Sequence, residues 1–202
     1  MHAHINLYPL VFTAWFHAPP KAAPLITASI FAAASLTDAV DGWLARAMDS
    51  CTPFGAFLDP VADKLAVVMA LVLISSRPHL AGPASSLPWL LPAATAAVVC
   101  REVTMSALRE WAAGTGPGAR AAAAVSAAGK AKTALQMVAV VALLLTSGRP
   151  CCAPQAGVGK AVHSAAAAVG APALVAGALL GLASLAQYFV ALWPWLSGRR
   201  RG

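Results

Sequence analysis

The sequence predicts an all-α membrane protein built as a bundle of six transmembrane helices. Of its 202 residues, 59% are hydrophobic and only 10% are charged, whereas about 25% of the residues in a soluble domain are charged. The mean hydropathy is +0.72. The apolar residues form runs of about 20, the length that a helix needs to cross a bilayer, and stretches rich in proline and glycine separate these runs.

The first half of the chain contains three of the predicted helices. Residues 5–16 are apolar but fall short of the roughly 20 residues that span a bilayer, so we expect the first helix to be truncated and the sequence to be a fragment. A turn at 17–21 precedes a second helix over 24–48. Thr52-Pro53 breaks the chain, and a third helix is expected over 54–76.

The second half holds the other three helices. We expect these helices over 89–112, 126–146 and 172–196. A proline-rich loop at 77–88 precedes them, a glycine-rich loop at 113–125 separates the first two, and 147–171 reads as a low-complexity loop. The whole chain, 1–202, is expected to be one membrane domain.

The net charge of +7 does not indicate nucleic-acid binding, because the basic residues are interleaved with apolar helices and form a tract only at 199–201. In the predicted topology, one side of the membrane holds the 47–53 turn, the 113–125 loop and the C-terminus. That side collects eight lysines and arginines, against four on the other side. Such an excess marks the cytoplasmic side, so we expect this side to face the cytoplasm in a bacterial inner membrane, or the stroma or matrix in an organelle.

The acidic residues are concentrated in one stretch, 38–63, which holds five of the seven. Asp38 and Asp41 are three apart and Asp59 and Asp63 are four apart, so each pair shares a helix face. Ionised groups inside a membrane are costly and are usually functional. Carboxylates are ligands that hard divalent cations prefer. The two pairs therefore predict a site for two Mg²⁺ or Mn²⁺ ions.

The same stretch resembles the signature of the CDP-alcohol phosphatidyltransferase family. The matching positions are Asp38, Asp41, Gly42, Ala45, Arg46, Gly55, Asp59 and Asp63. Two later segments, 101–111 and 124–137, are similar to those of the bacterial-type phosphatidylglycerophosphate synthases within that family. The resemblance implies transfer of the phosphatidyl group from CDP-diacylglycerol to glycerol 3-phosphate with release of CMP, a step toward phosphatidylglycerol and cardiolipin.

The resemblance also implies a role for each of these residues. Asp63 would be the general base that deprotonates the attacking hydroxyl, and the four aspartates would hold the metal ions. The residues implied to bind CDP are Asp38, Asp41, Gly42, Ala45, Arg46, Gly55 and Asp59. Their chemistry fits this role, because glycines allow a nucleotide to approach the helix backbone and the forked guanidinium of Arg46 suits a diphosphate.

The acceptor carries a phosphate of its own, for which four cations are candidates. These are Arg101, Arg109, Lys130 and Lys132. The two arginines are about two turns apart and share a helix face, and the lysines open the next helix near the same membrane surface. The alternative interpretation is structural, with ion pairs of Glu102 with Arg109 or of Arg101 with Glu110, and with the lysines as interfacial anchors.

Three other functions stay open. Another member of the same family would use inositol phosphate, serine or phosphatidylglycerol as the acceptor. A divalent-cation transporter would use the aspartates for permeation, although Gly42, Arg46 and Gly55 favour a nucleotide site. An inactive paralogue would keep the motif without turnover. Separately, the spacing of Gly177 and Gly181 permits close helix packing and a homodimer.

Overall fold

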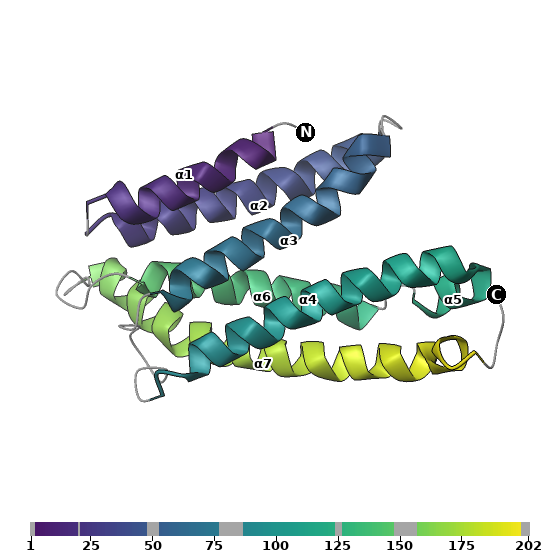
Figure 1. The fold of residues 1–202 in the computed structure, drawn as a ribbon. Helices are drawn as coiled ribbons and strands as arrows, with labels where there is room; N and C mark the ends of the chain where they lie inside the picture. The colour runs from purple at the N-terminus through teal and green to yellow at the C-terminus, as the bar shows by residue number, and fades with distance from the viewer. Residues whose placement is uncertain are drawn as a thin grey trace.

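The computed structural model describes residues 3–19, 21–47, 53–76, 87–123, 127–147 and 157–198, and within these ranges it contains helices and turns but no β-strand. The helices are α1 (Ala3–His17), α2 (Ala23–Ala47), α3 (Pro53–Ser75), α4 (Leu90–Thr115), α5 (Pro117–Ala122), α6 (Ala127–Thr146) and α7 (Gly157–Leu196). Figure 1 shows them as an elongated bundle. The prediction of an all-helical chain is confirmed.

Five helices lie where the sequence predicts them. The bounds of α1, α2, α3, α4 and α6 agree with the expected ranges to within a few residues, because each helix is an apolar run bounded by helix-breaking residues. The largest difference is at the end of α4, which continues to Thr115. Gly116 follows it with a φ of 145°, a conformation that residues with a side chain rarely adopt.

Two stretches that were predicted as loops contain helix. Within 113–125 the chain forms α5, whose first turn holds Pro117, a position where the missing proline N–H leaves no hydrogen bond unmade. The predicted linker at 147–171 is helical from Gly157 onward, because its low complexity comes largely from alanine, the strongest helix former. Pro172 lies inside α7 and bends the helix without ending it. Figure 1 shows the first, light-green part of α7 at an angle to its yellow remainder.

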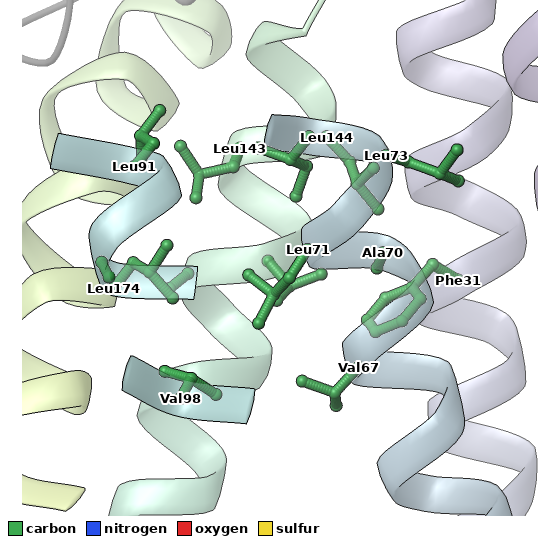
Figure 2. Packing of buried hydrophobic residues seen from close by; sticks show 14 of the residues in the cluster. Phe31, Val67, Ala70, Leu71, Leu73, Leu91, Val98, Leu143, Leu144 and Leu174 are labelled. Atoms are coloured by element: carbon green, nitrogen blue, oxygen red, sulfur yellow. The ribbon is translucent and has the colours of Figure 1, made fainter. Parts of the chain in front are cut away.

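The main hydrophobic core lies between α1, α2, α3, α4, α6 and α7. Leu71 and Ile74 of α3, Leu144 of α6 and Leu174 of α7 are completely buried in it. Figure 2 shows side chains from these helices converging on one another, with Phe31 contributed by α2. Each helix therefore presents an apolar stripe to the centre of the bundle.

A smaller core lies where α4, α5 and the last turns of α7 meet. It contains Met105, Leu108 and Ala112 of α4, Ala119 of α5 and Leu192 of α7. Both Ala112 and Ala119 are fully buried, so α5 packs tightly against α4 and α7.

One end of the bundle collects the helix ends that carry the predicted site. Figure 1 shows the carboxyl ends of α2, α4 and α7 and the amino ends of α3 and α6 at the same end, on the right of the view. We call this the aspartate end, because α2 and α3 carry the four aspartates of the motif. The described helix ends next to the 47–53 turn, the 113–125 loop and the C-terminus thus lie at one end of the bundle, and their side of the membrane stays a prediction.

Two of the described helices, α4 and α7, are long and apolar enough to cross a membrane. Shorter apolar segments occur at 23–37, 64–75 and 133–146, within α2, α3 and α6. Many large apolar side chains point out of the bundle, including Leu179 and Val190 of α7, which are 63% and 75% exposed. Exposed apolar surface of this extent is typical of a membrane or protein interaction site, so the fold is consistent with a membrane protein.

Candidate active site

The backbone of the motif is helical, whereas its side chains lie outside the part of the chain that the structure describes. Asp38 and Asp41 belong to α2, together with Gly42, Ala45 and Arg46. The other members, Gly55, Asp59 and Asp63, belong to α3. Among the residues whose side chains are described, no group of three or more His, Cys, Asp or Glu could hold a metal ion, so the metal prediction rests on these aspartates.

Helical spacing relates the positions of Asp38, Asp59 and Asp63 to described residues of the same helices. On α3, Asp59 and Asp63 continue the line of Val67, which is buried with Ala70 further along the same face. On α2, Asp38 lies three residues after Ser35, whose hydroxyl contacts Met137 Sδ of α6 at 4.0 Å. Residues three or four apart share a helix face. By spacing alone, therefore, the positions of Asp63 and Asp38 share helix faces with Val67 and Ser35.

The described side chains nearest to this motif in sequence form a polar link between α3 and α4. Lys64, directly after Asp63, donates a hydrogen bond to the hydroxyl of Ser106. That hydroxyl in turn donates to the carbonyl oxygen of Glu102 at 2.8 Å. Sequence reasoning missed Lys64, although a lysine inside an apolar helix beside an aspartate is itself a signal of function.

Arg101 is the most deeply buried of the predicted phosphate-binding cations whose side chains are described. Its side chain is 10% exposed and forms an ion pair with Glu102, which is 18% exposed. Its Nε atom is buried without a hydrogen-bond partner. The ion pairs predicted as alternatives, Glu102 with Arg109 and Arg101 with Glu110, are therefore wrong. Neighbouring residues do not face each other along an ideal helix, and only the bending of the two long side chains brings Arg101 and Glu102 together.

A small pocket with no room for a water molecule lies beside this ion pair, between α4, α6 and α7. Its polar lining consists of Arg101, Glu102 and Gln136, and its wall on α7 includes Gly177 and Gly181. A Cβ atom added at Gly177 would meet no atom within 4 Å. Both glycines are buried in α7 and line this pocket, with open space next to Gly177.

Arg109 lies two turns along α4 and also contacts α7. Its guanidinium carbon is 6.0 Å from the centroid of the Tyr188 ring, within the range of a cation–π interaction. Its Nε atom is buried without a hydrogen-bond partner. Arg101 and Arg109 thus share the α7-facing side of α4, as predicted, and each has a buried N–H group that a phosphate oxygen could accept from.

The side chains of Lys130 and Lys132 lie outside the described residues, although both positions belong to α6. Lys132 is four residues before Gln136, which lines the pocket beside Arg101. Lys130 is seven residues before Met137, which contacts α2. Spacings of four and seven keep positions on one face of a helix, so by spacing alone position 132 shares a face with Gln136 and position 130 with Met137.

The sequence matches the family model for CDP-alcohol phosphatidyltransferase over residues 3–176. The chain belongs to the CDP-alcohol phosphatidyltransferase family. Members of this family generally use divalent metal ions, which agrees with the carboxylates of the motif. The resemblance inferred from the aspartate motif is confirmed.

Three relatives illustrate the range of names within this family. The chain is 44% identical over 170 residues to CDP-diacylglycerol–glycerol-3-phosphate 3-phosphatidyltransferase 1, chloroplastic/mitochondrial, of Arabidopsis thaliana, covering 84% of this chain and 53% of that protein. It is 47% identical over 133 residues to an enzyme of Sodalis glossinidius named CDP-diacylglycerol–glycerol-3-phosphate 3-phosphatidyltransferase, covering 66% and 68%. It is 48% identical over 136 residues to cardiolipin synthase (CMP-forming) of Oryza sativa subsp. japonica, covering 67% and 41%. The chain therefore spans about half the length of the plant relatives it matches.

Proposed function

We propose that this chain is a CDP-diacylglycerol–glycerol-3-phosphate 3-phosphatidyltransferase, that is, a phosphatidylglycerophosphate synthase. The observation that carries the proposal is the complete aspartate motif on α2 and α3 of a chain in this family. The names of the relatives from Arabidopsis thaliana and Sodalis glossinidius support glycerol 3-phosphate as the acceptor. CDP-diacylglycerol and glycerol 3-phosphate are thus the proposed substrates.

The donor set of the motif fits divalent metal ions. Asp38, Asp41, Asp59 and Asp63 would hold two Mg²⁺ or Mn²⁺ ions, since both ions prefer carboxylate oxygen ligands. Bound there, the ions would neutralise the negative charge of the diphosphate and of the departing CMP. Four carboxylates within an apolar membrane chain call for compensating charge, which supports a cation between them.

Several residues of this chain would each have a separate role in the reaction. Arg46 would bind the diphosphate with its forked donors, while Gly42 and Gly55 allow close approach of the nucleotide. Asp63 would accept the proton of the sn-1 hydroxyl of glycerol 3-phosphate. The hydroxyl oxygen then bonds to the β-phosphorus of CDP-diacylglycerol, the bond from that phosphorus to the CMP oxygen breaks, and CMP departs with the bonding electrons.

The acceptor phosphate would be held by cations on α4 and α6. Arg109 and Arg101 each have a buried Nε–H without a hydrogen-bond partner, and Lys130 and Lys132 belong to the first two turns of α6. Charge-assisted hydrogen bonds to a phosphate are about twice as strong as neutral ones. Their strength favours this role over purely interfacial anchoring.

A second acceptor is favoured by one comparison. The relative named cardiolipin synthase is as similar to the chain as the relatives named for glycerol 3-phosphate. Phosphatidylglycerol is therefore the alternative acceptor. The segments at 101–111 and 124–137 resemble those of phosphatidylglycerophosphate synthases and favour glycerol 3-phosphate.

The proposal includes a place for the chain in the bilayer. Residues 1–202 would form one domain with six spans, and the aspartate end would face the cytoplasm in a bacterial inner membrane, or the stroma or matrix in an organelle. Its cationic residues favour that orientation. A homodimer is part of the proposal, with a contact surface away from the buried Gly177 and Gly181.

The test is CMP release by detergent-purified protein supplied with CDP-diacylglycerol, Mg²⁺ or Mn²⁺, and each acceptor in turn. Turnover with glycerol 3-phosphate, lost in Asp63→Asn and kept in Asp49→Asn, is the expected result. Asp49 is the matched control because it is the one aspartate outside the motif. Turnover only with phosphatidylglycerol would support the second acceptor. Absence of turnover with every acceptor would contradict an enzymatic function, and cation uptake into liposomes would then test transport.

A further inference from the structure

We propose that Lys64 is a positioning residue, whose bond to Ser106 holds the aspartates of α3 level with Arg109 of α4. The inference rests on the proposed function, because it concerns how the two substrate-binding regions are aligned. Lys64 is half-buried between the two helices, and its hydrogen bond to Ser106 crosses from α3 to α4. Neither the sequence motif nor the predicted phosphate-binding cations include these two residues.

A second hydrogen bond between the same helices defines their register. Ser75 and Thr95 share a hydrogen bond of 2.9 Å between their hydroxyls. Eleven residues separate Lys64 from Ser75 on α3, and eleven separate Thr95 from Ser106 on α4. Eleven residues are close to three full turns, or about 16 Å of helix. The two bonds therefore lie on one face of each antiparallel helix, and they fix a single alignment of α3 against α4.

That alignment places the predicted site residues at definite levels. Since Lys64 lies opposite Ser106, the α3 turn from Asp59 to Asp63 lies opposite residues 107–111 of α4. Arg109 is in the middle of that range. Residue 107 of α4 lies opposite Asp63. Arg101 is six residues, or about 9 Å of helix, further from the aspartate end than residue 107. Of the two arginines, Arg109 is the one level with the aspartates of α3.

The two hydrogen bonds are made by side chains of different length. Two short hydroxyl side chains meet at Ser75 and Thr95, so the helices are close together there. At the other position the long side chain of Lys64 makes the contact, and Figure 1 shows α3 and α4 separating toward the amino end of α3. The Lys64 ammonium thus supports α3 where direct packing against α4 decreases, next to Asp63.

The contact itself is tested without any activity measurement. A double-mutant cycle compares the thermal unfolding of Lys64→Met, Ser106→Ala and the double variant in detergent. Methionine keeps an apolar stem of similar length, and we expect the two substitutions to be clearly non-additive, as residues in direct contact are. Additive effects would mean that the bond is absent in solution, and the proposal would fail.

The positioning role is tested by the separate Michaelis constants of the two substrates. Ser106→Ala should lower kcat/KM for glycerol 3-phosphate by about tenfold, because a small misplacement of the reacting groups is costly to the rate, and leave the KM for CDP-diacylglycerol within about twofold. Ser106→Thr and Lys64→Arg, which keep the hydroxyl and the cation, should restore most of the loss. Thr95→Val is the matched control, because it removes the other bond between α3 and α4.

Each outcome bears on one part of the proposal. Equal kinetic losses in Ser106→Ala and Thr95→Val would reduce the Lys64 bond to general stabilisation and overturn the positioning role. A rise in the KM of CDP-diacylglycerol alone would also overturn it. If the unmodified protein releases no CMP with any acceptor, the proposed function fails and the positioning role fails with it, while the double-mutant cycle still reports whether the contact exists.

Discussion

The buried pair of Arg101 and Glu102 offers the sharpest test of whether a cation in this bundle serves structure or substrate. Their side chains are 10% and 18% exposed, so neutralising Glu102 removes the carboxylate partner of a largely buried arginine. Removing one partner of a buried pair costs about 3–5 kcal/mol, whereas removing both is often neutral. Glu102→Gln should destabilise the protein by that amount, and the double variant with Arg101→Gln should regain most of the loss.

The two roles then separate in the double variant. If Arg101 also binds the acceptor phosphate, the loss of about 1.5–3 kcal/mol of charged hydrogen bonding lowers kcat/KM for glycerol 3-phosphate by about 10- to 100-fold, even though stability has returned. The assays are thermal unfolding and CMP release on the same detergent preparation, with both single variants alongside. A double variant that regains both stability and turnover would refute phosphate binding by Arg101.

Three further predictions test other parts of the structure. A Cβ at Gly170 would lie 3.1 Å from two side-chain carbons of Leu143, whereas one at Gly177 would meet nothing within 4 Å. Both alanine substitutions gain about 1 kcal/mol of helix propensity, but at Gly170 overpacking costs about 1–3 kcal/mol. Gly170→Ala should therefore unfold at a lower temperature than Gly177→Ala. The reverse order of unfolding temperatures would contradict the packing. Removal of divalent ions with a chelator should abolish CMP release, with recovery on adding Mg²⁺ or Mn²⁺, and full activity in the chelator would refute the aspartate metal site. Tyr188→Leu removes the ring near Arg109, an interaction of about 0.5–1 kcal/mol, and should lower kcat/KM for the acceptor about two- to fivefold, while Tyr188→Phe should not.

The positions of most helices followed from the sequence because each apolar run has a breaker at both ends. The same reasoning failed at 157–171, where a segment of low complexity was interpreted as a linker although its alanines favour helix. Composition alone does not separate an alanine-rich linker from an alanine-rich helix. The difference lies in the packing of residues such as Ala166 and Gly170, both buried in α7.

The contacts between side chains could not be predicted from the residue pattern within each helix. The alignment of α3 with α4 depends on contacts between residues 20 and 42 positions apart, and no periodicity within either helix encodes it. The pairing of Arg101 with Glu102 depends on side-chain conformation, since neighbours on a helix normally diverge. The aspartate motif, by contrast, was found at once because its spacing is local and its residues are rare in an apolar chain.

The cationic residues at the aspartate end help to distinguish between the two proposed acceptors, which sequence identity to the relatives does not. The charge of Arg101 is offset by Glu102, whereas among the described residues Arg109 contacts an aromatic ring and no carboxylate. Lys130 and Lys132 lie in the first two turns of α6, at the same end. A phosphate monoester carries about −1.5 to −2 charges at pH 7, and a phosphodiester headgroup carries one. Arg109, whose contacts among the described residues include no carboxylate, therefore suits the larger negative charge of a phosphate monoester such as glycerol 3-phosphate.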